Sequence, residues 1–139
     1  VPDEIVIPLI EKRLAEAKNV RGFIFKGFPR TLVQSYILDG LLKKHGCTSP
    51  MILEIQVPVL QLIERLDRRS RTRDAMPYDS GTEKIVKRLR EHELKTLPVI
   101  RKYGEIHGVT RIDGTGTFEE VFEACAAEVR ALFKVGGST

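Results

Sequence analysis

Hydrophobic residues recur at the three- and four-residue spacing of an amphipathic helix over most of this chain. The spacing predicts a first helix over residues 3–18 with Asp3 as its N-cap, and Pro8 requires this helix to start late or to bend. Further helices are predicted over residues 31–44, from 58 into the arginines after 64, from a capping box at 80–83 through a bend at Pro98, and after 117 as far as 133.

Three short apolar runs between these helices have the form of buried strands, at residues 23–25, 51–57 and 109–112. Strands that alternate with helices indicate an α/β fold with a parallel sheet, and ligands bind at the carboxyl ends of such strands. The loop after the first run contains Gly27 and Arg30, which suit a close approach of the backbone and the binding of an anion. We therefore expect a ligand site at this end of the sheet.

The composition fits one domain with a core and excludes a disordered chain. The 139 residues are 42% hydrophobic and carry a net charge of +4, and no apolar stretch approaches the length of a membrane span. Cys47 and Cys125 lie far apart without partners at ligand spacing, which predicts free thiols, no metal site and a reducing, cytoplasmic location. Because Val1 is neither an initiator Met nor the start of a signal peptide, we expect the chain to begin inside a longer one.

The one dense group of basic residues in the chain is a cluster of arginines, which could bind an anionic partner. A guanidinium binds phosphate with two parallel hydrogen bonds, although a solvated helix end is an equally good interpretation of this cluster taken alone. Nucleic acid is not expected as the partner, because only 6% of residues are aromatic and there is no Trp for base stacking. The cluster consists of Arg65, Arg68, Arg69, Arg71 and Arg73, interrupted by Asp67 and Asp74.

The segment from Gly22 to Gln34, GFIFKGFPRTLVQ, resembles the AMP-binding signature of adenylate kinases and related nucleoside monophosphate kinases, GFxxDGFPRTxxQ. The resemblance continues through the opening VPDEIV, the R-x-x-x-R of residues 65–69, IVKRL at 85–89, TLP at 96–98 and IDGTG at 112–116. It implies a three-layer α/β/α fold with a parallel sheet of P-loop kinase type, in which residues 1–139 form a partial domain.

The resemblance also implies roles for single residues. The AMP site would consist of Val1, Gly27, Arg30 and Gln34, with Arg30 on the phosphate and Gln34 on the base. Arg65, Arg69 and Arg88 would surround the phosphates during transfer, as catalytic residues that neutralise their charge. The ATP adenine would lie against Gly114, Thr115, Gly116 and Thr117, with Arg65 on the ATP side as well.

The sequence departs from the family pattern in three ways. The first strand and the GxxGxGK phosphate loop are not found in these residues, so that the ATP phosphates lack their cradle of backbone amides. Lys26 stands where the family has an Asp near Mg²⁺. In the short lid, about residues 70–82, Pro77 replaces an Arg, Asp79 keeps one carboxylate and Ser80 replaces another; Arg71 and Arg73 are candidates to substitute for the lost Arg.

These observations predict an adenylate kinase-like phosphotransferase that converts ATP and AMP to two ADP with Mg²⁺, of which this chain is a fragment with negligible turnover. The alternative is a degenerate kinase domain that binds nucleotide or serves assembly without catalysis, which Lys26 and the altered lid favour. The missing strand would lie between residues 23–25 and 51–57. We therefore expect a poorly stable monomer, or one that self-associates through the unpaired strand edges.

Overall fold

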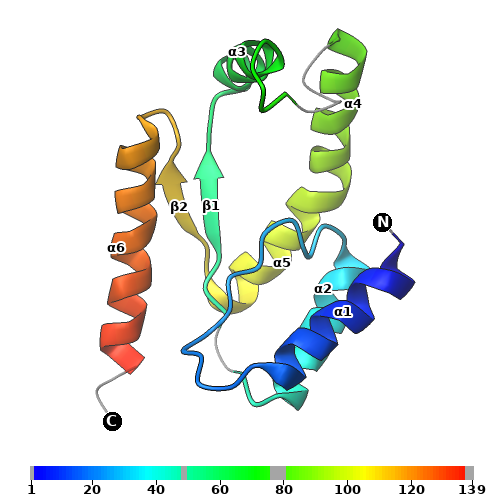
Figure 1. The fold of residues 1–139 in the computed structure, drawn as a ribbon, viewed down its shortest axis with the longest axis vertical. Coiled ribbons are helices and arrows are strands. Elements are labelled where there is room, and N and C mark those ends of the chain that lie inside the picture. Colours follow the sequence, from blue (N-terminus) through cyan, green and yellow to red (C-terminus); the bar gives the residue numbers. More distant parts are fainter. Residues whose placement is uncertain (1, 48–49, 76–80, 137–139) are drawn as a thin grey trace.

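A computed structural model of the chain describes residues 2–47, 50–75 and 81–136 (Figure 1). Two helices come first, followed by a strand and helix, a long helical segment, and a final strand and helix. In chain order these elements are α1 (Asp3–Glu16), α2 (Leu32–Lys44), β1 (Leu53–Gln56), α3 (Val59–Ser70), α4 (Thr82–Glu91), the π-helical segment η1 (His92–Thr96), α5 (Leu97–His107), β2 (Thr110–Asp113) and α6 (Phe118–Gly136).

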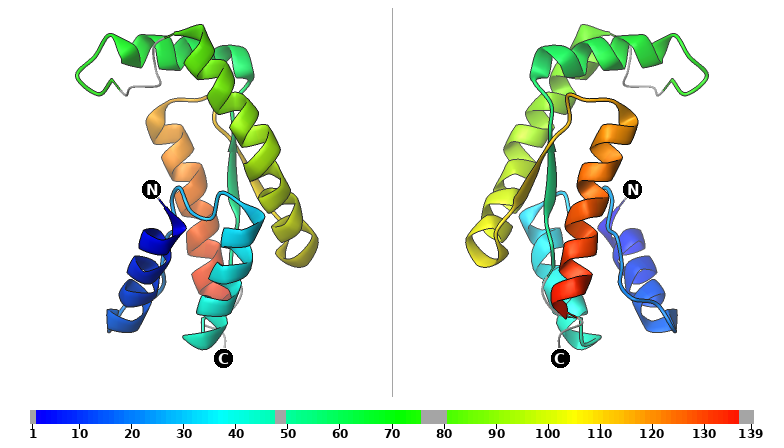
Figure 2. Two further views of the ribbon diagram at one scale, coloured as in Figure 1. Left: turned by 90° about the vertical axis from the view of Figure 1, so that its right-hand side faces the viewer. Right: turned by 90° about the vertical axis from the view of Figure 1, so that its left-hand side faces the viewer.

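The two strands pair in parallel, with Leu53 opposite Thr110 and Gln56 opposite Asp113. The pairing continues past the strand ends, where the Gly114 amide donates to the Gln56 carbonyl at 2.8 Å. α6 returns antiparallel to β2 and packs against it, and the segment from α4 to α5 lies on the other side of the strands (Figures 1 and 2). The predicted α/β class with parallel strands is confirmed.

The prediction of a strand at residues 23–25 is wrong, because this segment is an irregular part of the loop between α1 and α2. Ile24 is 92% exposed there. A strand exists through its backbone partner, and β1 pairs with β2 in the only sheet found among the described residues. The strand predicted at 51–57 is shorter, and its Ile55 is 53% exposed rather than buried.

The start of α1 differs from the prediction. Pro2 is the N-cap, and Asp3 is the first helical residue with its side chain bonded elsewhere. Pro8 lies inside the helix and does not delay its start. The carbonyl of Glu4, which would accept from an amide at position 8, belongs to an exposed residue and can bond to water instead.

The bend predicted at Pro98 has a structural counterpart just before it, in the π-helical segment η1. Pro98 is one of the first residues of α5 and has no amide to bond the carbonyl one turn back. A π-helical turn accommodates that lost bond without ending the helix. The helix before η1, α4, begins after Gly81. Ser80 of the predicted capping box lies outside the described residues.

The core is small and divided among the elements. It contains seven buried hydrophobic residues among those described, contributed by five of the helices and by β2. Between α2 and α5 the contact is polar, around Ser35, which is completely buried. None of the described helices is long and apolar enough to cross a membrane. The core residues are Leu14, Leu38, Leu66, Ile85, Val99, Tyr103 and Ile112.

Candidate functional site

The loop after β2 is ordered by the carboxylate of Asp113. Its Oδ1 accepts from the Thr115 amide at 2.9 Å and from the Thr115 hydroxyl at 2.6 Å. These two hydrogen bonds lower the pKa of Asp113. Gly114 lies so close to β1 that a Cβ there would come within 2.7 Å of Ile55 Cγ2 and of Val57 Cγ2. Only glycine therefore allows the loop to leave the sheet along this path.

Two side chains of α3 hold the same loop from the other side. Arg65 donates through Nη2 to the carbonyls of Thr115 and Gly116, both at 3.3 Å. Gln61 Nε2 donates to the Thr115 carbonyl at the same distance. The structure thus brings Arg65 together with residues 114–117, as the sequence predicted for one site.

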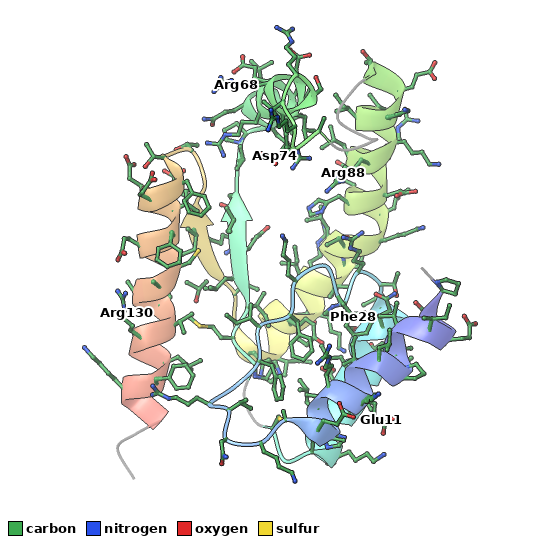
Figure 3. The ribbon with its side chains drawn as sticks, in the orientation of Figure 1. Glu11, Phe28, Arg68, Asp74, Arg88 and Arg130 are labelled. Atoms are coloured by element: carbon green, nitrogen blue, oxygen red, sulfur yellow. The ribbon has the colours of Figure 1, made fainter. Side chains whose placement is uncertain are left out.

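A hollow of about 370 Å³ lies between α3 and this loop, and it is open to solvent. A second hollow, of about 410 Å³, shares part of its lining with the first and is also lined by Phe118 and Val121 of α6. Arg68 lines both and projects from α3 toward α6 (Figure 3). The sequence places Arg68 in the arginine cluster that could bind phosphate, but the family resemblance gives it no role of its own; it lies one helical turn after Arg65.

The second group of predicted residues lies in the loop before α2 and in its first turn. Gly27 has φ of +78°, and a Cβ there would lie 3.1 Å from Arg30 Nη2, so the guanidinium folds back over the glycine. Thr31 caps α2, because its Oγ1 accepts a hydrogen bond from the backbone N–H of Gln34 at 3.2 Å. Because residues 23–25 form no strand, this group does not follow a strand end as the sequence predicted.

Gln34 joins this loop to α1. Its Oε1 accepts from the backbone amide of Arg30 at 2.8 Å, and its Nε2 donates to Asp3 Oδ1 at 2.7 Å. Gly27, Arg30 and Gln34 therefore form one unit, which is anchored on α1 through Asp3, a residue that the sequence predicts only as a helix cap. Val1, the fourth predicted residue of this group, lies outside the described residues.

The remaining predicted arginines are distributed over α3, α4 and the segment predicted to begin the lid. Arg69 lies on α3 and Arg88 on the side of α4 that faces α3, and both make interactions within the chain (Figure 3). Arg71 pairs with Asp67 at 3.0 Å, on the surface. Arg73 follows in the exposed segment, whereas Asp79 lies outside the described residues, as do Pro77 and Ser80.

The described residues do not build a metal site of their own. Across residues 2–47, 50–75 and 81–136 there is no group of three or more His, Cys, Asp or Glu side chains that could hold an ion. Lys26, which stands where the family has an Asp near Mg²⁺, is exposed.

Comparison with known proteins supports the resemblance seen in the motifs. The sequence model of the adenylate kinase family matches residues 1–107. Adenylate kinase of Maricaulis maris strain MCS10 is 40% identical over 128 residues, which cover 91% of this chain and 66% of that protein.

Two further adenylate kinases give the same picture. That of Xylella fastidiosa strain M12 is 36% identical over 91% of this chain and 66% of its own length. That of Caulobacter sp. strain K31 is 40% identical over 87% of this chain and 63% of its own. The chain thus spans slightly less than two thirds of the relatives it matches. Since the family match covers most of its residues, the chain belongs to the adenylate kinase family.

Proposed function

We propose that the protein transfers a phosphoryl group between ATP and AMP, and that residues 1–139 contribute the AMP site and part of the arginine shell. The observation that carries the proposal is the unit of Gly27, Arg30 and Gln34, which combines a fork for phosphate with an amide for a base. Membership of the adenylate kinase family supports this interpretation over a degenerate assembly module.

In this proposal Arg30 binds the AMP phosphate and Gln34 the base. The Arg30 guanidinium is exposed and lies over a glycine, so it can turn toward a phosphate without leaving a buried partner unsatisfied. The Arg30 backbone is meanwhile tied to Gln34. The backbone that carries the guanidinium is thereby held next to the amide that would bind the base, which helps to position AMP for phosphoryl transfer.

The ATP side would be formed by Arg65 with Gly114, Thr115, Gly116 and Thr117. Backbone groups of this loop suit the flat face and edge of adenine, and the hollow beside it is open to solvent. Arg65, Arg69 and Arg88 would neutralise charge on the phosphates as it moves between donor and acceptor. Mg²⁺ would enter with ATP and add its charge to theirs.

The exposed Lys26 would oppose the ion if it lies near the phosphates, because both are cations. Residues 1–139 also contain no GxxGxGK loop. We therefore expect these residues on their own to bind AMP and to show negligible ADP formation.

The experiment compares AMP binding and ADP formation in the full-length protein with those of two variants. Arg30→Ala removes the phosphate fork, and Arg13→Ala removes an exposed arginine of α1 as a matched control. A hydrogen bond to a charged group contributes roughly 1.5–3 kcal/mol, so Arg30→Ala should weaken AMP binding by about tenfold or more. Equal binding by the two variants, or no ADP formed from ATP and AMP by the unaltered protein, would refute the proposal.

A further inference from the structure

The amide of Gln34 is held between two groups that can each bond only one of its ends. The backbone N–H of Arg30 is a donor and requires Oε1, which it meets at 2.8 Å. The carboxylate of Asp3 is an acceptor and requires Nε2, which it meets at 2.7 Å. Turning the amide by 180° would place donor against donor and acceptor against acceptor, at the cost of both hydrogen bonds.

Two hydrogen-bonding positions of this amide remain for a ligand. A side-chain amide has two N–H donors and two acceptor lone pairs, and the contacts to Arg30 and Asp3 use one of each. What is left is one acceptor on Oε1 and one donor on Nε2, in an order set by these contacts. Gln34 is half-buried, so an unmatched group pressed against it would lose water without gaining a partner.

We propose that Asp3 is a positioning residue that makes the site selective for 6-aminopurine over 6-oxopurine monophosphates, by fixing the direction of the Gln34 amide. A 6-aminopurine presents an exocyclic donor beside a ring acceptor, and a 6-oxopurine presents the reverse order. An amide of fixed direction matches the first and opposes the second. The inference rests on the proposed function, because it assigns the base to Gln34.

Asp3 is distinguished from its neighbour by this contact. Asp3 and Glu4 both lie in the first turn of α1, where negative charge is favoured by the helix dipole. Asp3 is half-buried and bonded across 31 positions of sequence to Gln34, whereas Glu4 is exposed. The two carboxylates therefore share any effect on helix stability, and only Asp3 acts on the amide.

The test measures the dissociation constants of AMP and IMP, which differ only in the 6-substituent and the N1 hydrogen, in the full-length protein. Asp3→Asn replaces an obligate acceptor by an amide that can donate or accept, and Glu4→Gln is the control with the same change of charge. The AMP preference should fall by about tenfold in Asp3→Asn, since a hydrogen bond to a charge contributes roughly 1.5–3 kcal/mol. It should stay unchanged in Glu4→Gln.

A purely structural role for Asp3 would weaken both nucleotides equally and leave their ratio unchanged, and that result would overturn the inference while leaving the proposed function intact. If Asp3→Asn does not fold, Asp3→Ser, which suits the start of a helix, is measured in its place with the same expectation. If the unaltered protein binds neither nucleotide, the proposed function fails and the inference fails with it.

Discussion

The polar cluster between α2 and α5 gives the sharpest prediction of stability. Lys102 Nζ lies 2.6 Å from Asp39 Oδ2 and 3.0 Å from Ser35 Oγ, and 3.8 Å from the centre of the Tyr36 ring. The Tyr103 hydroxyl donates to Asp39 Oδ1 at 2.9 Å. The Lys102 side chain is only 10% exposed, whereas that of Asp39 is 36% exposed. The two charges of this pair are thus unequally hydrated.

This inequality predicts that removing the two charges has unequal effects. Asp39→Asn leaves the ammonium buried without a counter-charge. Breaking a buried pair costs roughly 3–5 kcal/mol, and partial exposure of Asp39 reduces this to about 2–3 kcal/mol. Lys102→Met leaves a carboxylate that water and Tyr103 still satisfy, and the new side chain packs well, so we expect a loss of about 1 kcal/mol.

Urea unfolding followed by circular dichroism measures both losses and that of the double variant. With neither charge present, the double variant should be more stable than the sum of single losses predicts, by about 1–2 kcal/mol. If Lys102→Met is the more damaging change, or if the losses simply add, the burial of the ammonium is not what makes this pair matter. Lys43→Met, an exposed lysine of α2, should change little.

The loop at Gly114 and the hydroxyl of Tyr103 allow two further tests. Gly114→Ala should lower the free energy of unfolding by roughly 1–3 kcal/mol, because the new Cβ would overlap with Ile55, and it should weaken ATP binding. Gly40→Ala is the control, because there is open space around this residue of α2, and it should raise the free energy of unfolding by roughly 0.5–1 kcal/mol. Equal unfolding midpoints for the two variants would contradict this. Burial, with a carboxylate as hydrogen-bond partner, raises the pKa of Tyr103. The stability that the neutral Tyr103 hydroxyl contributes to the folded protein is therefore complete below about pH 10 and is lost as the pH rises further. Tyr103→Phe should flatten this alkaline fall in the free energy of unfolding, and Tyr36→Phe should not.

The helices could be predicted from the sequence because their information is local. The helix predicted over 31–44 is present as α2, and Thr31 caps it. The long helical segment has the expected irregularity next to Pro98. The grouping of Arg65 with residues 114–117 could also be predicted, because parallel strands bring their carboxyl ends together.

The misjudged features depend on partners that are distant in sequence. An apolar run such as 23–25 has the composition of a strand, but a strand needs a neighbour, and composition does not reveal one. Asp3 had the right position and residue type for a cap. Its carboxylate instead bonds Gln34, and no local pattern distinguishes these two uses. Both cases are tertiary contacts that override a local preference.

Two arginines of the candidate site are held by interactions that a phosphate could replace. Arg65 donates to neutral carbonyls at 3.3 Å, and Arg71 forms an exposed pair with Asp67, of a kind that contributes about 0–1 kcal/mol. A phosphate offers the same guanidinium two shorter, charge-assisted bonds. In the proposed function, binding a nucleotide would therefore exchange weak contacts for strong ones at little cost. The pair of Lys102 and Asp39 is better buried, and it can keep α2, which carries Gln34, in place during this exchange.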